Sequence, residues 1–372
     1  MTAASTTTRA AEKGLPAKDN GRWNRMVRTP ELTLAAAALA GFLTLTVATD
    51  GNMLTSGTLG AFFRFLAVPM TIGLSQMVVL AIGQMNLSVG VLTGFCAMVG
   101  AWLMLEAGLP APAAVAGAML LGALAGLGNG LLVVLTRINA FIVTLATMTI
   151  IDGLRYGVNG PGTYQDYSAG LREFGQASFV GLPLVFLTAV AVAVLVWLFF
   201  ARTVAGRHML ASGGSPFAAR LSGVSNDRSI LLAHTLSGLL AGVAAVLTLA
   251  QSGSVNATIG DDLLLPSFAA PIIGGVALAG GVVSVVGTCL AAFIVRLIDV
   301  TQAQFGINRR WVDLIIGAVV LGVVLLGALR NCAPCSAGRK ARPAEPSGRT
   351  DLWPARNTGG WSWRHGHPSS PC

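Results

Sequence analysis

Charged side chains are scarce in this sequence. Only 10% of its 372 residues are Asp, Glu, Lys or Arg, whereas a soluble domain carries about 25%. Hydrophobic residues make up 54% of the chain, and the mean hydropathy is +0.71. This composition excludes an ordinary soluble globular domain and predicts a polytopic membrane protein.

Motifs for nucleotide binding and for catalysis are also lacking. The sequence has no G-x-x-x-x-G-K-[ST], so no P-loop is expected, and the glycine cluster at 274–281 is better explained by helix packing and a tight turn. Neither G-x-S-x-G nor H-E-x-x-H occurs, and two of the four histidines, His365 and His367, lie near the C-terminus. We therefore expect a chain that is not an enzyme.

Acidic side chains avoid the apolar runs. They fall at the ends of these runs or in loops: Asp50, Glu106, Asp166, Glu173, Asp261, Asp262 and Asp313. Ion-coupled transporters usually carry ionisable groups inside the membrane, so this distribution argues against a proton-coupled secondary transporter. The polar residues left inside are neutral: Gln76, Gln84, Asn129, Thr144, Thr147 and Thr149. They suit a pathway for a neutral, hydrogen-bonding solute, although hydrogen bonds between helices explain them equally well.

The net charge of +9 lies almost entirely at the two ends of the chain. Residues 1–30 and residues 331–372 each hold six basic and two acidic side chains. The nearly neutral remainder offers no basic face for a phosphate backbone, so no nucleic-acid partner is expected. The first 30 residues lack a cleavable signal pattern, and the first apolar run is interpreted as an anchor.

Ten apolar segments are long enough to be membrane spans or parts of them. They cover 32–49, 62–83, 86–105, 112–135, 140–157, 181–201, 229–250, 265–279, 282–298 and 312–329. The eighth is short and contains Pro266 and Pro271, which predicts a broken or re-entrant helix. We predict an all-α membrane helix bundle of about ten helices, with nine or eight as alternatives. It occupies 31–330, between an N-terminal tail (1–30) and a disordered C-terminal tail (331–372).

The distribution of basic residues gives an orientation. Both tails and the segment 202–228, which contains Arg202, Arg207, Arg220 and Arg228, are expected on the cytoplasmic side. At the outer ends of spans, the i, i+3 spacing predicts the ion pairs Asp152–Arg155 and Arg296–Asp299. The long outer loop 158–180 either caps the bundle or contacts an external partner.

Cysteine usage gives little sign of a metal site. Cys96 and Cys289 lie in apolar runs and are expected to pack as small hydrophobic residues. Cys332 and Cys335 form a C-x-x-C in the tail, which suggests zinc, but a second ligand pair at finger-like spacing is missing. We expect no metal.

Residues 213–228, GGSPFAARLSGVSNDR, interrupt the apolar pattern. Ser215 suits a helix N-cap, Pro216 the first turn and Gly223 the C-terminal stop. The pattern predicts a short amphipathic helix from Phe217 to Ser222 on the cytoplasmic face, able to dock into a groove of a partner protein. A solvated loop is the alternative.

Four stretches of the chain, in order, resemble the ribose/xylose-type permeases, which are the membrane subunits of bacterial ABC sugar importers. GRHMLASGGSPFAARLSGVSNDR (206–228) resembles their cytoplasmic coupling segment, and MNLSVGVLTG (85–94) their Asp-Leu-Ser-Val-Gly segment. GNGLLVVLTRINAFIVTLATMTIIDGL (128–154) and the later stretches LSGLLAGVAAVL and IIGGVALAGGVVSVVGTCLAA are also similar. The resemblance covers about 60–328.

The resemblance implies the partners and sites of such a subunit. It implies a second permease copy or paralogue, two cytoplasmic ATPase subunits that hold ATP and Mg, and an extracytoplasmic solute-binding protein, in a bacterial inner membrane. This chain itself would carry no cofactor. The expected ATPase-coupling positions are Arg207, Pro216, Ala218, Ala219, Arg220, Leu221, Ser222 and Gly223. The expected translocation pathway contains Asn86, Ser88, Asn129, Phe141, Thr144 and Thr147.

The expected function is import of a monosaccharide or related polyol. Other small polar solutes, such as a branched-chain amino acid or a nucleoside, remain alternatives within the superfamily, and a secondary transporter is an alternative outside it. The sequence departs from the family pattern at Asn86, where Asp is usual, at Asp152, where Arg is usual, and at Pro266 and Pro271. These departures concern the choice of solute.

Overall fold

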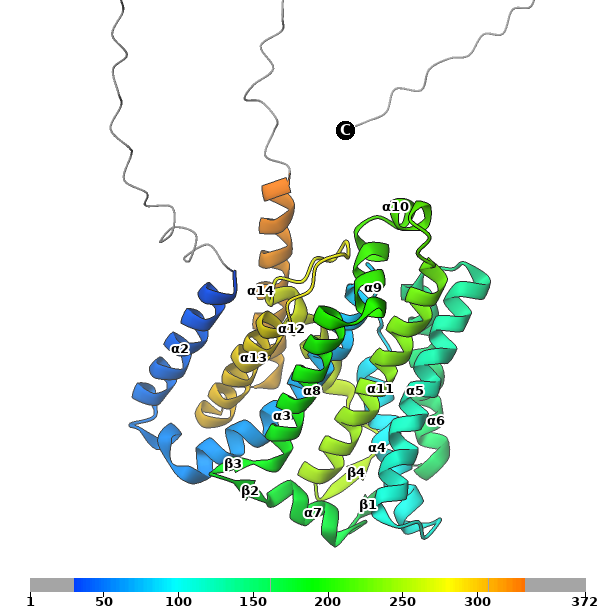
Figure 1. Ribbon diagram of the computed structural model, residues 1–372. Coiled ribbons are helices and arrows are strands. Elements are labelled where there is room, and N and C mark those ends of the chain that lie inside the picture. Colours follow the sequence, from blue (N-terminus) through cyan, green and yellow to red (C-terminus); the bar gives the residue numbers. More distant parts are fainter. Residues whose placement is uncertain (1–29, 161, 307, 332–372) are drawn as a thin grey trace, which may run out of the picture. The chain divides into compact units, whose positions relative to one another are not determined.

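A computed structural model describes residues 30–160, 162–306 and 308–331 (Figure 1). The long helices are α2 (Pro30–Ala48), α3 (Ser56–Leu80), α4 (Val89–Leu105), α5 (Ala111–Thr136), α6 (Ala140–Asn159), α8 (Leu184–Arg202), α11 (Asn226–Gln251), α13 (Val285–Phe305) and α14 (Arg309–Asn331). The short helices are η1 (Asn52–Leu54), α7 (Ala169–Gln176), α9 (Val204–Gly214), α10 (Pro216–Leu221), η2 (Asp261–Leu263) and α12 (Leu264–Ile273). The strands are β1 (Thr163–Gln165), β2 (Ser178–Phe179), β3 (Leu182–Pro183) and β4 (Ser254–Asn256). The predicted tails and the C-x-x-C lie outside the described residues.

Each of the ten expected apolar segments corresponds to a helix, so the all-α membrane bundle is confirmed. Among the described residues, seven helices are long and apolar enough to cross a membrane. Helix α4 is slightly shorter, with 17 residues. Helix α12 has ten residues and is about 15 Å long, roughly half the thickness of a bilayer core. The eighth segment, predicted to be a broken or re-entrant helix, is therefore a short helix that contains Pro266 and Pro271.

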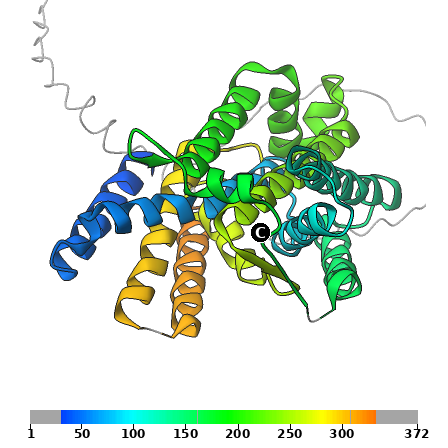
Figure 2. The same ribbon diagram turned by 90° about the horizontal axis from the view of Figure 1, so that it is seen from below.

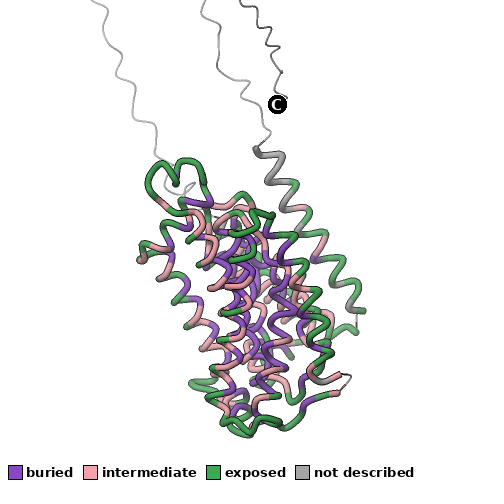
Figure 3. The backbone as a smooth tube through the Cα atoms, turned by 90° about the vertical axis from the view of Figure 1, so that its right-hand side faces the viewer, coloured by how far each residue is buried: buried purple, intermediate pink, exposed green. Residues whose placement is uncertain are grey.

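The core of the bundle forms around α3 and α11. From Leu66 to Leu80, all but Pro69 of the residues of α3 are buried, because α11, α12, α13 and α8 surround this helix. In Figure 3 the buried residues gather in the interior, and exposed residues follow the outward sides of the peripheral helices. Leucine, isoleucine and valine side chains on α5, α6 and α8 are exposed, as expected for helices that face lipid or a partner subunit.

Helices α2, α13 and α14 lie on one side of α3, away from α5 and α6 (Figure 2). Ala269 of α12, Val295 of α13 and Ile316 of α14 form a small buried cluster. Phe62 of α3 packs edge-on against Phe293 of α13, with ring centroids 4.9 Å apart. The half-length helix α12 is thus covered by protein, which a short helix inside a membrane requires.

Helices α5 and α11 pack closely through glycine. A Cβ atom at Gly126 would lie 2.2 Å from the carbonyl oxygen of His234, and one at Gly122 would lie 2.4 Å from that of Gly238. Two helices can come this close only where the residue at the contact is glycine, which has no side chain. The glycines of this stretch therefore form a packing face between α5 and α11.

The loop expected to cap the bundle is ordered around α11. Strand β1 pairs antiparallel with β4, and α7 packs against α11. The Tyr167 hydroxyl donates to the Leu249 carbonyl (2.5 Å) and to that of Ser252. Burial raises the pKa of Tyr167 to about 12, which keeps the hydroxyl protonated as a donor. Of the two roles considered for this loop, the structure supports capping.

Both expected ion pairs are present at this end of the bundle. Arg296 and Asp299 are 4.0 Å apart. Arg155 pairs with Asp152, as its spacing predicts, and also with Asp261 at 2.6 Å, which the local pattern does not predict. The Arg155 guanidinium also donates to the Ile259 carbonyl (3.0 Å), and its side chain is only 1% exposed. A buried cation with two carboxylate partners joins α6 to the segment before α12.

We predict that Gly126→Ala destabilises the bundle, because the added methyl group collides with backbone rather than with a movable side chain. Overpacking of this kind costs about 1–3 kcal/mol. Thermal unfolding of the detergent-solubilised protein should therefore begin several degrees lower. Gly128→Ala is the matched control on the same helix, since a Cβ there meets nothing within 4 Å. Equal melting of the two variants would contradict this packing.

Candidate functional site

Helix α10 lies at one end of the bundle, and α7 and the strands lie at the other (Figure 1). The Ser215 hydroxyl accepts from the Ala218 amide (3.3 Å), Pro216 occupies the first turn, and Gly223 has φ +79°. Each of these residues acts as the sequence predicts. The predicted helix 217–222 is confirmed to within one residue at each end.

Most of the expected coupling positions are on the surface. Arg207, Pro216, Ala218, Arg220, Leu221, Ser222 and Gly223 are exposed, whereas Ala219 is buried against the bundle. Phe217 and Leu221 are 72% and 76% exposed, so two large apolar side chains of one short helix extend away from the bundle. The Asn226 amide donates to the Pro216 carbonyl (2.9 Å), which ties α10 to the start of α11.

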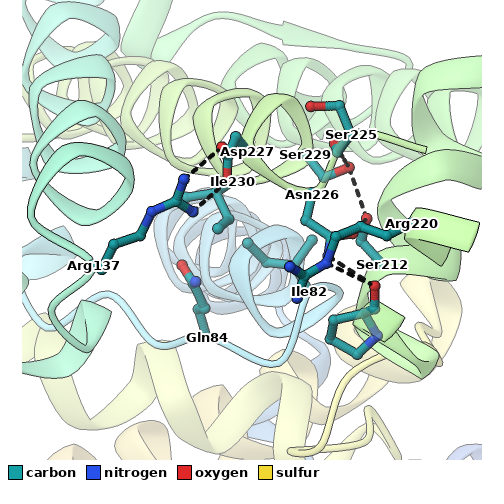
Figure 4. A pocket seen from close by; sticks show the side chains of 11 residues that line it. Ile82, Gln84, Arg137, Ser212, Arg220, Ser225, Asn226, Asp227, Ser229 and Ile230 are labelled. Carbon is teal, nitrogen blue, oxygen red and sulfur yellow. Dashed lines mark hydrogen bonds and ion pairs between the residues drawn. The ribbon is translucent and has the colours of Figure 1, made fainter. Parts of the chain in front are cut away.

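A polar cavity of about 350 Å³ lies beneath α10 (Figure 4). Its lining residues come from α9, α10, α11 and three connecting segments: Ile82, Gln84, Arg137, Ser212, Pro216, Arg220, Ser225, Asn226, Asp227, Ser229 and Ile230. Arg137 donates to both carboxylate oxygens of Asp227 (2.7 and 3.0 Å), and this hydrogen bond raises the pKa of Arg137. Hydrogen bonds from Ser212 to Asn226 and Ser229 (2.9 and 3.0 Å) hold α9 against α11. An adjoining cavity shares Ile82, Gln84, Arg137 and Ile230.

The segment between α3 and α4 is non-helical, and all of its residues except Gly83 are buried or half-buried, so its backbone needs partners inside the protein. With its nitrogen directed at the Asn86 carbonyl, the Gln76 amide donates to that oxygen (2.9 Å) and accepts from the Asn86 amide (3.3 Å). The Leu87 amide donates to the Thr144 hydroxyl (3.1 Å). Two polar side chains of neighbouring helices thus replace the missing helical hydrogen bonds.

A hydrogen-bond network extends from this segment through α5 and α6. The Asn86 side-chain oxygen accepts from the Ser88 hydroxyl (2.7 Å), which accepts from the Asn129 amide (3.1 Å). The Asn129 oxygen accepts in turn from the Thr147 hydroxyl (2.6 Å). Asn86, Ser88, Asn129 and Thr144 are at most 1% exposed. Five of the six predicted pathway residues therefore lie together, whereas Phe141 is 46% exposed on the side of α6.

Sequence reasoning missed the contribution of α3 and α11 to this network. The Ser237 hydroxyl accepts from the side-chain amide of Asn86 (3.2 Å) and lies 2.9 Å from the Ser75 hydroxyl. One turn earlier on α11, the His234 Nε2 atom is 2.9 Å from the Gln84 oxygen. The available signal was the spacing of His234 and Ser237, which puts both on one helix face. Because Gln84 also lines the cavity beneath α10, polar groups continue from that cavity to the buried network.

A second polar cavity, of about 380 Å³, lies toward the opposite end of the bundle, between α3, α11, α12 and α13. Its wall combines neutral hydrogen-bonding groups and the ring of Phe65 with charged side chains. The neutral groups include Thr248, Gln251 and Gln302, and the charged ones are Asp262 and the ion pair of Arg296 with Asp299. Leu263 and Pro266 contribute the wall at the start of α12. Within the described part of the chain, no three His, Cys, Asp or Glu residues lie close enough together to hold a metal ion.

We predict that Asn129→Leu weakens the network, because it removes the donor to Ser88 and the acceptor for Thr147. Loss of a buried partner costs about 1–3 kcal/mol, measurable as a lower midpoint of thermal unfolding. Thr149→Val is the control, since that exposed hydroxyl bonds the Leu145 carbonyl of its own helix. An Asn129→Leu variant as stable as Thr149→Val would contradict the assignment.

The chain is similar to permease subunits of bacterial import systems. Its relatives include the autoinducer 2 import system permease protein LsrC of Enterobacter sp. (strain 638), 33% identical over 308 residues, which covers 82% of this chain and 89% of that protein. The LsrD permease protein of Photorhabdus luminescens is 28% identical over 306 residues, covering 79% of this chain and 90% of that protein. No solved structure matches.

A protein-family model matches residues 59–324, most of the membrane bundle. This range includes α10, both cavities and the buried network, and it agrees with the resemblance inferred from residues 60–328. The chain belongs to the family described as branched-chain amino acid transport system / permease component.

Proposed function

We propose that this permease is the membrane subunit of an ATP-binding cassette importer for a monosaccharide or related polyol. The observation that carries the proposal is α10, a capped helix that holds two large apolar side chains out of the bundle at one end. A permease without a P-loop needs an ATPase on another chain, and α10 provides a surface for one. The similarity to permeases of autoinducer 2 import systems supports the same conclusion.

In this proposal, α10 docks into a groove on one of the two cytoplasmic ATPase subunits, and the second permease contacts the other. Phe217 and Leu221 lie four positions apart, so they share one helix face and supply the apolar anchors. Arg207 and Arg220 add positive charge around them, and the exposed residues Pro216, Ala218, Ser222 and Gly223 complete the contact segment. Ala219, which was expected among the coupling positions, is buried and packs α10 against the bundle. ATP and Mg bind to the ATPase. A second permease and an extracytoplasmic solute-binding protein complete the importer. The second permease is supported by the relatives, which include both LsrC and LsrD permease proteins.

The translocation pathway in this proposal runs along the buried network. Side chains of Asn86, Ser88, Asn129 and Thr147 hydrogen-bond one another, and the Thr144 hydroxyl accepts from the Leu87 backbone amide beside them. A polyol offers the same donors and acceptors, so it replaces these partners without leaving a buried polar group unpaired. Phe141 lies on the exposed side of α6, where a second permease would complete the pathway. Autoinducer 2, named for the relatives, is a specific candidate solute.

We expect Arg220→Glu, and deletion of residues 216–223, to reduce solute uptake at least tenfold without loss of membrane insertion. Reversed charge or loss of α10 disrupts the ATPase contact, while the bundle retains its core. The measurement is uptake of labelled D-ribose and of autoinducer 2 by cells that contain the whole importer, with a branched-chain amino acid and a nucleoside as competitors. Arg310→Glu, at the other end of the bundle, is the matched control. Unimpaired uptake in the α10 variants would refute this role.

The proposal places α10 and both chain termini in the cytoplasm. We therefore expect Gln165→Cys, in β1, to react with a membrane-impermeant maleimide in intact spheroplasts. Ser222→Cys should react only after permeabilisation, because it follows α10 directly. Labelling is read at each peptide by mass spectrometry, which separates these sites from the native cysteines. The reverse pattern would contradict the orientation.

A further inference from the structure

Near the end of α9, three segments that are distant in sequence contact one another through backbone atoms. A Cβ atom at Gly213 would lie 2.0 Å from the Ala81 carbonyl oxygen and 2.6 Å from the Gly281 amide nitrogen. The Gly281 amide donates to the same Ala81 oxygen (2.9 Å). We call Ala81, Gly213 and Gly281 the backbone junction. It joins the end of α3, the helix that precedes α10 and the loop that follows α12.

Backbone atoms meet directly at the backbone junction, so the three segments have little freedom to slide past one another. A Cβ at Gly280 would lie 2.6 Å from the Gly83 amide nitrogen and 3.0 Å from the Gly213 Cα. Gly281 has φ +82°, a conformation that suits glycine. Close-packed contacts of this kind transmit displacement, because packed interiors are hardly compressible.

Close backbone contacts are also found at both ends of α12. At the C-terminal end of this helix, a Cβ at Gly274 would lie 2.6 Å from the Thr288 amide nitrogen of α13. At its N-terminal end, the preceding segment lies on α4, where a Cβ at Gly94 would lie 1.8 Å from the Ile259 oxygen. Helix α12 is thus a ten-residue element held at both ends by backbone contacts.

The two ends of α12 belong to different parts of the molecule. Its C-terminal loop meets α9 at the backbone junction, directly before α10. Its N-terminal end supplies Leu263 and Pro266 to the wall of the cavity of about 380 Å³. A displacement of α9 that reaches α12 therefore changes the shape of that cavity.

We infer that α12 acts as a strut, a rigid element that transmits movement of α9 and α10 to the cavity lined by Leu263 and Pro266. Gly213 is the positioning residue, because α9 contacts the loop that follows α12 at this position. The inference rests on the proposed function, in which an ATPase moves α10. It adds the route by which that movement reaches the opposite end of the bundle. The cavity then opens to polyol in one state and closes in the other.

The first test compares two adjacent glycines of α9 in the purified importer, reconstituted in liposomes with its ATPase and solute-binding protein. Gly213→Ala places a methyl group into the junction, whereas a Cβ at Gly214 has its nearest neighbour, the Gly281 Cα, 3.9 Å away. We expect Gly213→Ala to raise the ATP hydrolysed per solute imported at least fivefold, and Gly214→Ala to leave it unchanged. A purely structural role for Gly213 would lower hydrolysis and import in proportion, and that result would overturn the inference.

The second test leaves the backbone junction unchanged. It therefore tests the role of α12 even if the Gly213→Ala variant fails to fold. Leu263→Cys is introduced into the otherwise native chain of the importer, and its reaction with maleimide is followed by peptide mass spectrometry. We expect the rate to change at least threefold between the nucleotide-free complex and the complex trapped with ATP and vanadate. Unchanged labelling would overturn the strut.

Uptake by the native chain separates this inference from the function on which it rests. Import that requires no ATP refutes the importer itself. ATP-dependent import with unchanged labelling at Leu263→Cys refutes only the strut.

Discussion

The structure depends on one constraint: backbone polar groups inside a membrane need partners within the protein. Residues 81–88 are not helical, yet they lie among buried helices. Gln76 bonds both backbone groups of Asn86, Thr144 bonds the Leu87 amide, and Ala81 accepts from Gly281. Gln76 and Thr144 thus lie where backbone leaves the helix. Because these two side chains are neutral, they can exchange partners with an uncharged solute without the desolvation cost of a charge.

Glycine makes the same arrangement possible by letting main chain meet main chain. Contacts at Gly126, Gly94 and Gly213 bring carbonyl oxygens to within 2.2 Å of where a Cβ would stand. In lipid, helices gain little from burying apolar side chains against each other, so close packing supplies much of the association energy. Packing this tight also restricts motion to whole elements. In a permease, such packing favours movement of a few rigid groups of helices against one another. The proposed route of movement begins at α10 and ends at the start of α12.

Much of this architecture was predictable from local patterns. Apolar runs located the membrane helices, and the eighth run was already short in the sequence. The Ser215, Pro216 and Gly223 signals defined α10. Contacts between distant residues were not predictable, since hydropathy and capping act over a few positions. Arg155 meets Asp261 across 106 residues, and Asn129 meets Ser88 across 41. Family resemblance grouped Phe141 with the polar residues, although its side chain faces outward in this chain.

The central claim is that this permease works as part of an ATP-driven importer. The most direct measurement is purification of the tagged protein from its native cells in mild detergent, with the co-purifying chains identified by mass. The account predicts an ATPase subunit and an extracytoplasmic binding protein in the eluate, and a complex that loses the ATPase when residues 216–223 are deleted. A chain that purifies alone and still transports solute without ATP would contradict it.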